Sequence, residues 1–118
     1  MTVTIEMKLP SLNEYINVCR TNKYQAAAYK RQIESDIMWF IKPLPRYEKP
    51  VVIDFVWYEE NRKRDPDNVA SAKKFILDAL VKAGKIQGDS SKYVEGFSDR
   101  FFYGEQAMVE ISIREVQK

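Results

Sequence analysis

The chain has 118 residues with a formal net charge of +2, and 45% of its residues are hydrophobic. This length suits one domain over residues 1–118, and the composition is that of a globular protein. Histidine is absent and Cys19 is the only cysteine, which excludes disulfide frameworks, zinc fingers and imidazole-based catalytic triads. Any catalysis must use carboxylates, lysines, arginines, hydroxyls or a hard metal ion.

The sequence gives no sign of membrane insertion or secretion. Its longest unbroken apolar run, residues 37–41, is far shorter than a membrane span. The first ten residues lack a basic patch followed by an apolar stretch, so no signal peptide is expected. We therefore expect a cytoplasmic protein without a membrane partner.

The first third of the chain predicts a strand, a connection and a helix. Apolar and polar side chains alternate over residues 1–9, which indicates a half-buried strand. The partly polar segment 11–22 is expected to be a connection. Apolar residues at helical spacing predict a helix over 24–42, and Pro43 and the prolines that follow it prevent the helix from continuing.

The middle of the chain predicts a central strand and a second helix. Residues 51–58 are β-branched or aromatic on both faces except at Asp54, as in a buried strand. The helix is expected over 67–83, with Gly84 as its C-terminal signal. Its expected buried stripe consists of Val69, Ala72, Ile76, Ala79, Leu80 and Ala83.

Two more strands are predicted near the C-terminus, over 92–103 and 107–115, with Gly104 and Glu105 in the turn between them. The element order is then β-α-β-α-β-β. This order predicts an α+β fold, in which two helices pack on a mixed four-stranded sheet. Trp39 and Trp57 are both expected in the core.

Side chains able to support catalysis are concentrated between residues 62 and 89. Three consecutive cations precede two aspartates, and a further aspartate follows the predicted helix; these residues are Arg62, Lys63, Arg64, Asp65, Asp67 and Asp89. One interpretation is purely structural: Asp65 and Pro66 form a common helix start, the cations lie in a solvated loop, and Asp89 lies in a turn. A cap, however, needs only one aspartate.

Helix geometry adds a lysine to this group. At about 100° per residue, Lys74 lies only about 20° from the meridian of Asp67 on a continuous helix, and Lys73 points well away. Asp78 lies too far along the axis to share a metal with Asp67 and is expected to pair with Lys74 and Lys82.

Clustered carboxylates without histidine or thiol are hard oxygen ligands, which suit Mg²⁺ and also Mn²⁺. Such an ion can lower the pKa of a bound water and neutralise charge on a phosphodiester, and a nearby lysine can stabilise the charge that develops. This is the chemistry of a metal-dependent nuclease.

One family has this combination of motifs. The chain carries RKRDPDNVASAKKFILDALVKAG, then IQGDSSKY, and near its start LPSLNEY. In these motifs, and over most of its length, it resembles the RusA-type Holliday junction resolvases of phages and prophages. The resemblance implies a homodimer that binds branched DNA and cuts opposed strands of a four-way junction, using Mg²⁺ or Mn²⁺ and no small-molecule cofactor. It also implies the cytoplasm of a bacterium or of a phage-infected host cell.

The resemblance also implies roles for particular residues. Asp65, Asp67 and Asp89 match the metal-binding acids, and Lys74 best matches the essential lysine, with Lys73 as the weaker alternative. The expected DNA contacts are Asn13, Tyr15, Arg62, Lys63, Arg64, Asn68 and Lys73, although Tyr15 is equally well explained as a core aromatic. The sequence departs from the family in two places: Lys74 comes seven rather than four residues after Asp67, and Gly88 stands where several members have an acid.

Two other functions remain open from the sequence. The chain could be a related nuclease that acts on flaps or forks. It could also be a non-catalytic DNA-binding or replication-accessory module, in which the aspartates only cap a helix.

Overall fold

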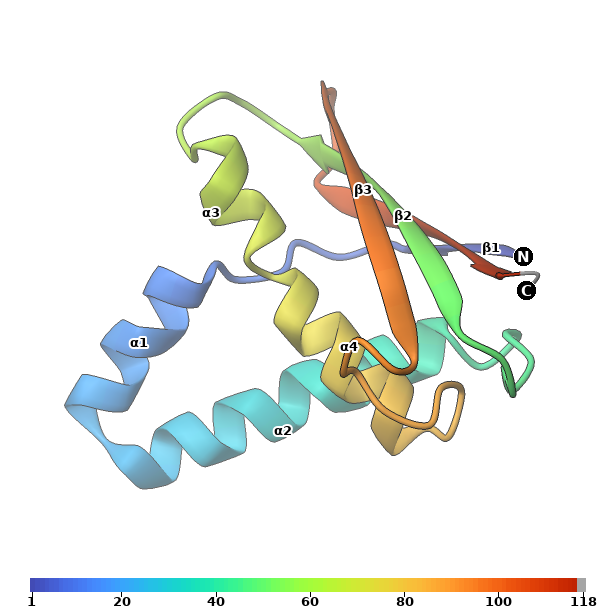
Figure 1. Cartoon of the computed structure of the whole chain (residues 1–118). Helices are drawn as coiled ribbons and strands as arrows, with labels where there is room; N and C mark the ends of the chain where they lie inside the picture. Colours follow the sequence, from blue (N-terminus) through green and yellow to red (C-terminus); the bar gives the residue numbers. More distant parts are fainter. Residues whose placement is uncertain (117–118) are drawn as a thin grey trace.

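The strands form one mixed sheet in the order β1-β4-β2-β3 (Figure 1). Their bounds are β1 Thr2–Ile5, β2 Val51–Glu59, β3 Val94–Tyr103 and β4 Met108–Glu115. β2 pairs in parallel with β3, whereas the β2–β4 and β1–β4 pairs are antiparallel. The structure is a computed structural model that describes residues 1–116. The predicted α+β class, the mixed four-stranded sheet and the central position of β2 are confirmed.

Within residues 1–116, four helices rather than the predicted two lie together on one side of this sheet (Figure 1). Their bounds are α1 Leu12–Thr21, α2 Lys23–Phe40, α3 Pro66–Ala70 and α4 Lys73–Lys82. No helix in residues 1–116 is both long enough and apolar enough to cross a membrane.

The core lies between the sheet and the helices. Along β2 the residues alternate between buried and half-buried, with Ile53, Phe55 and Trp57 on the buried side. On α4, Ile76 and Leu80 are fully buried. The predicted stripe of this helix is confirmed except at Ala83, which is half-buried.

The predicted element order lacks one of the two helices between β1 and β2, because segment 11–22 contains helix α1 rather than a connection. The Ser11 side chain caps this helix by accepting a hydrogen bond from the Glu14 backbone N–H at 3.1 Å. Ser11 and Glu14 have the Ser-x-x-Glu spacing of a capping box, and this is the local signal for α1. Leu12, Tyr15, Ile16 and Cys19 also have the spacing of an amphipathic helix, although none of them is fully buried.

The predicted helix over 67–83 is interrupted at Ser71 and Ala72. The Ser71 hydroxyl donates to the Asn68 carbonyl at 2.6 Å and accepts from the Leu12 backbone N–H at 2.9 Å. The backbone N–H of Ala72 bonds three residues back, to the Val69 carbonyl. A serine that bonds back to its own helix tends to bend it. The helix direction therefore changes between α3 and α4 (Figure 1).

The predicted turn at Gly104 and Glu105 connects β3 and β4, but the two strands do not pair, because β4 lies on the far side of β2 from β3. One further expectation is corrected. Trp39 is 67% exposed, whereas Trp57 belongs to the core as expected. Trp39 is exposed because it lies outside the α2 stripe formed by Ile33 and Ile37, which are both buried.

Candidate functional site

Asp65 and Asp67 lie at the start of α3, where Asp65 is the N-cap residue and Asp67 lies in the first turn. The Asp65 side chain makes no capping hydrogen bond. Both residues are exposed, and neither carboxylate forms an ion pair or a hydrogen bond with another side chain in residues 1–116. The Asp65 carboxylate therefore does not cap the helix by hydrogen bonding, while Pro66 and the acidic first turn keep the features of a common helix start.

Lys74 is paired with two aspartates. Its ammonium lies 3.1 Å from Asp78 Oδ1 and 3.2 Å from Asp89 Oδ2. Hydrogen bonds first to Asp78 and then to Asp89 raise the pKa of Lys74 above its usual value. The predicted pairing of Asp78 with Lys74 is confirmed, whereas the predicted pairing with Lys82 is wrong, because Lys82 pairs with Glu34. Asp78 receives its second lysine from α2, because Lys30 lies 3.2 Å away.

The helix argument that selected Lys74 assumed a straight helix from Asp67 to Lys74. The bend at Ser71 removes that premise, and the structure places Lys74 beside Asp89 and Asp78 instead. Lys74 and Asp89 are fifteen residues apart in the sequence. Two of the four predicted catalytic residues are therefore brought together by α4 and the loop that follows it.

The three predicted metal ligands do not form one group. Within residues 1–116, no three acidic or cysteine side chains are positioned to hold a metal ion. Of these three residues, Asp89 forms an ion pair with Lys74, whereas the carboxylates of Asp65 and Asp67 are free to bind a cation. Two carboxylates fit Mg²⁺, which commonly binds one or two of them and fills its remaining positions with water and substrate phosphate oxygens.

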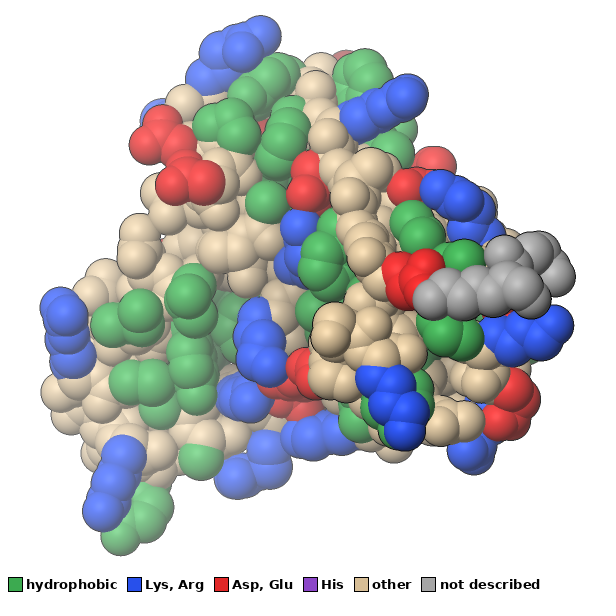
Figure 2. Space-filling view, viewed as in Figure 1, with side chains coloured by type: hydrophobic (Ala, Val, Ile, Leu, Met, Phe, Trp, Pro, Cys, Tyr) green, Lys and Arg blue, Asp and Glu red, His purple; other side chains and the backbone are tan. Residues whose placement is uncertain are grey.

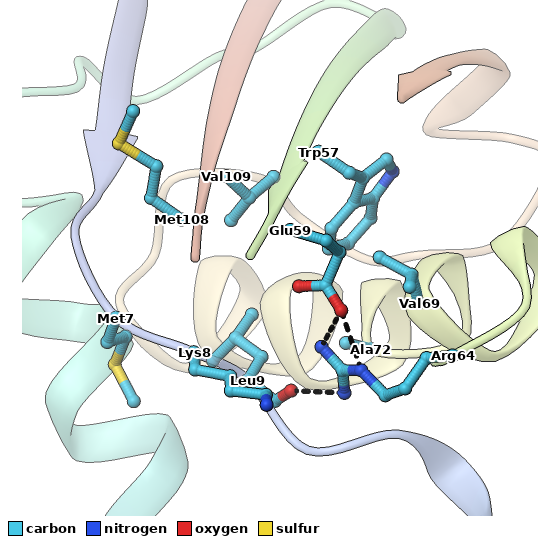
Figure 3. Close-up of a pocket in the computed structure, with 10 residues that line it drawn as sticks. All are labelled: Met7, Lys8, Leu9, Trp57, Glu59, Arg64, Val69, Ala72, Met108 and Val109. Atoms are coloured by element: carbon cyan, nitrogen blue, oxygen red, sulfur yellow. Dashed lines mark hydrogen bonds and ion pairs between the residues drawn. The ribbon is translucent and has the colours of Figure 1, made fainter. Parts of the chain in front are cut away.

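Arg64 is a structural anchor. Its guanidinium pairs with Glu59 Oε1 at 2.7 Å and donates to the Leu9 carbonyl at 2.9 Å, as Figure 3 shows. The side chain is only 16% exposed. Arg64 therefore joins the end of β2 to the segment before α1. The cavity beside it measures about 10 Å³, which is room for about one water.

The other two cations of the triplet remain at the surface. Arg62 is exposed, and its guanidinium lies 4.0 Å from the centre of the Tyr103 ring on β3. Lys63 is exposed, and its backbone N–H bonds to the Asn61 side chain. Both side chains are accessible to a ligand, so the expected DNA contacts at Arg62 and Lys63 stay predictions.

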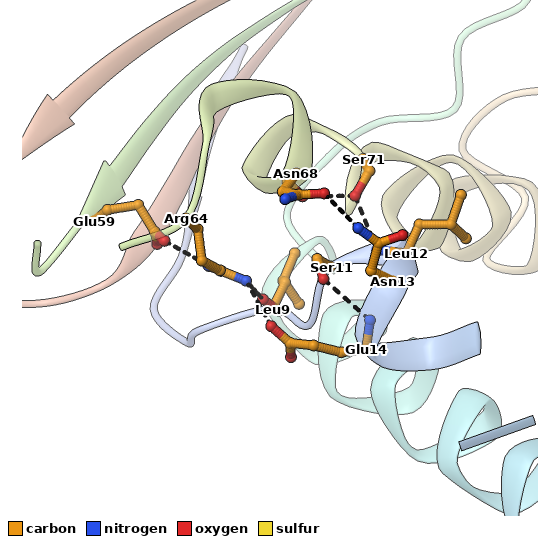
Figure 4. Close-up of polar contacts among 9 residues, drawn as sticks. All are labelled: Leu9, Ser11, Leu12, Asn13, Glu14, Glu59, Arg64, Asn68 and Ser71. Carbon is orange, nitrogen blue, oxygen red and sulfur yellow. Dashed lines mark hydrogen bonds and ion pairs between the residues drawn. The ribbon is translucent and has the colours of Figure 1, made fainter. Parts of the chain in front are cut away.

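Two predicted DNA contacts bond to each other. Asn13 Nδ2 donates to Asn68 Oδ1 at 2.9 Å and so joins the first turn of α1 to α3 (Figure 4). The bond between Leu12 and Ser71 lies beside it and holds the same two helices together. Either asparagine would have to exchange this contact in order to bind DNA.

Tyr15 and Lys73 pack within the fold. The half-buried Tyr15 ring stacks on Tyr29 at 6.5 Å and meets Phe75 edge-on at 5.5 Å. This geometry supports its interpretation as a core aromatic. The Lys73 ammonium lies 2.8 Å from Asp99 Oδ2 and 4.7 Å from the centre of the Phe97 ring. Lys73 therefore contacts β3, away from Asp78 and Asp89.

An open hollow of about 370 Å³ lies where α2, α4 and the loop after α4 meet. Its lining residues are Lys30, Lys74, Asp78, Val81, Lys82 and Asp89. Figure 2 shows acidic and basic side chains side by side over α2 and α4. Sequence reasoning missed Lys30 and its partner Glu34. The available signal was their spacing of four residues on a predicted helix, which is typical of an ion pair.

Comparison with known proteins leaves the function open. No protein-family model matches the chain, and no curated protein matches it significantly.

Proposed function

We propose that the protein is a metal-dependent, structure-selective endonuclease that resolves four-way DNA junctions. The observation that carries this proposal is the pairing of Lys74 with Asp89 at 3.2 Å, because the residues that match a nuclease motif meet in space despite their distance in sequence. The free carboxylates of Asp65 and Asp67 at the start of α3 support it further.

In this proposal Asp65 and Asp67 would hold Mg²⁺ or Mn²⁺, and the exposed Lys63 and Arg62 would bind phosphates beside them. When bound, the ion would activate a water and neutralise charge on the phosphodiester. The ammonium of Lys74 borders the open hollow. In this proposal it would exchange one of its aspartate contacts for a phosphate oxygen that becomes more negative during cleavage. Asp89 fixes the position of this ammonium.

A four-way junction requires two matched cuts, and each chain offers one such site. We therefore include a homodimer in the proposal, because a twofold dimer matches the symmetry of the substrate. Static light scattering of the purified protein measures this directly: a monomer that cuts both strands of a junction would contradict it.

A non-catalytic DNA-binding module is the second candidate. It is favoured by one observation, the absence of a three-acid group in residues 1–116. The two candidates differ in chemistry rather than in binding, so the decisive measurement is Mg²⁺-dependent strand cleavage.

The test uses labelled four-way junctions, flaps and forks at one fixed salt concentration, with wild-type protein, Asp67→Asn and Asp36→Asn. Asp36 is a matched control because it lies on α2 and its carboxylate bonds only Gln32 within residues 1–116. We expect wild type and Asp36→Asn to cut the four-way junction. We expect Asp67→Asn to lose at least about a hundredfold in rate, while its junction affinity stays within about twofold, since only a metal ligand is removed.

Two results would overturn parts of this proposal. Cleavage by Asp67→Asn at the wild-type rate would remove Asp67 from the catalytic site. Binding without cleavage by the wild-type protein, on every branched substrate and with either metal, would favour the DNA-binding module. Faster cleavage of flaps or forks than of four-way junctions would assign the enzyme to the related nuclease activity.

A further inference from the structure

A chain of alternating charges connects the core of the molecule to Lys74. It begins at Glu34 on α2, which is 1% exposed although it is a carboxylate. Neither of its oxygens has a hydrogen-bond partner in residues 1–116, and its charge is compensated by ion pairs with Lys82 and, at 3.6 Å, with Lys30. A buried carboxylate is costly unless cations are held close to it, so Glu34 restricts where the Lys30 ammonium can lie.

Lys30 in turn restricts the position of a carboxylate on α4. Its ammonium lies 3.2 Å from Asp78 Oδ2, and the other oxygen of Asp78 lies 3.1 Å from Lys74. Asp78 is thus held between two lysines from different helices, with only 18% of its side chain exposed. Without Lys30, Asp78 could rotate toward solvent and would no longer fix the Lys74 ammonium.

Lys74 needs such a restraint because its side chain is 59% exposed. An exposed lysine ordinarily samples many rotamers, and a single ion pair at the surface holds it weakly. The pairing with both Asp78 and Asp89 defines one position for the ammonium at the edge of the hollow.

We infer that Lys30 is a positioning residue that holds the Lys74 ammonium toward Asp89 by fixing Asp78. The effect on catalysis rests on the proposed nuclease function. The effect on the geometry of Lys74 does not, because it follows from the ion pairs between α2 and α4. Lys30 therefore belongs to the site although it lies 35 positions before Asp65 in the sequence.

The first measurement needs no activity. The ammonium group of Lys74 is observed by ¹H–¹⁵N NMR of the full chain and assigned with Lys74→Arg. We compare wild type with Lys30→Met, Lys30→Arg and the control Arg31→Met, which removes the same charge from an exposed neighbour on α2. We expect the Lys74 signal to shift or broaden in Lys30→Met and to be retained in Lys30→Arg and Arg31→Met.

The second measurement separates positioning from DNA binding. At saturating protein and Mg²⁺, we expect Lys30→Met to slow single-turnover cleavage of a four-way junction about tenfold, as is typical when a supporting residue is lost. The dissociation constant should match that of Arg31→Met. Lys30→Arg should recover most of the rate. In an Asp78→Asn background, Lys30→Met should cause no further loss, because Lys30 acts through Asp78.

The outcomes are distinguishable. An unchanged Lys74 signal in a folded Lys30→Met protein overturns the inference, whether or not the protein cleaves DNA. A weaker junction affinity than that of Arg31→Met overturns it as well, because Lys30 would then be a phosphate contact. A shifted Lys74 signal in a protein that cleaves no DNA supports the positioning and rejects the nuclease function. If Lys30→Met does not fold, Lys30→Gln provides the same comparison.

Discussion

Lys73 and Lys74 are neighbours in the sequence, but their ammonium groups bind carboxylates in different parts of the fold. Lys74 Nζ lies 3.2 Å from Asp89 Oδ2, whereas Lys73 Nζ lies 2.8 Å from Asp99 Oδ2 on β3. Successive residues of a helix point about 100° apart. One lysine therefore faces the open hollow, and the other packs against the sheet.

This separation predicts different consequences for the two alanine variants. We expect Lys74→Ala to reduce junction cleavage strongly and to change the free energy of unfolding by less than about 0.5 kcal/mol, because its side chain is mostly exposed. We expect Lys73→Ala to keep most of the cleavage activity and to lose about 1 kcal/mol of stability, since it removes the Asp99 pair and the contact with Phe97. Cleavage kinetics and urea unfolding of both variants measure these effects; the reverse order in cleavage would contradict the assignment of Lys74.

The contacts of Arg64 predict that it contributes mainly to stability. We expect Arg64→Lys to lower the free energy of unfolding by about 2 kcal/mol, because lysine cannot bond Glu59 and the Leu9 carbonyl in the same way. The control Arg62→Lys should change it by less than about 0.5 kcal/mol, since Arg62 is exposed. Urea unfolding measures both. An unchanged stability for Arg64→Lys, together with weaker DNA binding, would restore Arg64 as a phosphate contact.

Gly84 is required by the backbone at the end of α4. Its φ is +73°, and the Lys85 N–H bonds back to the Leu80 carbonyl at 2.9 Å, which closes the helix in a Schellman motif. We expect Gly84→Ala to destabilise the protein by about 1 kcal/mol, because a side chain disfavours this conformation. Gly104→Ala is the matched control: Gly104 has no positive φ and open space around it. Thermal unfolding should show a loss of stability for Gly84→Ala and none for Gly104→Ala.

Tyr47 predicts a loss of stability at high pH. Burial, with a smaller contribution from Glu115, raises the pKa of Tyr47 above its usual value of 10.0. The unfolded chain therefore releases this proton first as the pH rises. The contribution of Tyr47 is fully present below pH 10 and is lost as the pH rises through the folded-state pKa. We expect Tyr47→Phe to make the decline in unfolding free energy above pH 10 shallower. An identical slope in denaturant titrations of both proteins would contradict this.

Short sequence patterns predicted most elements of the fold, because the signal for each helix or strand lies within a few neighbouring residues. Alternation identified β1 and β4, β-branched and aromatic content identified β2, helical spacing identified α2, and Gly84 marked the end of α4. α1 has a local signal as well, in the capping-box spacing of Ser11 and Glu14. The helical spacing of Leu12, Tyr15, Ile16 and Cys19 is a second local signal, which the prediction of a connection overlooked.

The arrangement of the strands could not be read in this way. β3 and β4 follow each other with a short turn, which favours a hairpin, yet β4 pairs with β2 and β1 instead. The buried side chains of β4, Val109, Ile111 and Ile113, complete the central part of the core, whereas most residues of β3 are exposed. β4, the more apolar of the two strands, therefore lies inside the sheet, and β3 lies at its edge. Which strand takes the inner position depends on the packing of the whole sheet.

The sequence by itself determined which residues can support chemistry, because side-chain type and spacing are local properties: carboxylates, lysines and arginines without histidine, concentrated between residues 62 and 89. Only the tertiary structure decided which of them meet. It pairs Lys74 with Asp89, directs Lys73 to β3, fixes Arg64 inside the fold and brings Lys30 from α2 to Asp78. The physical reason is that such contacts join segments far apart in the chain, and their geometry is set by how helices and strands pack rather than by any neighbouring residue.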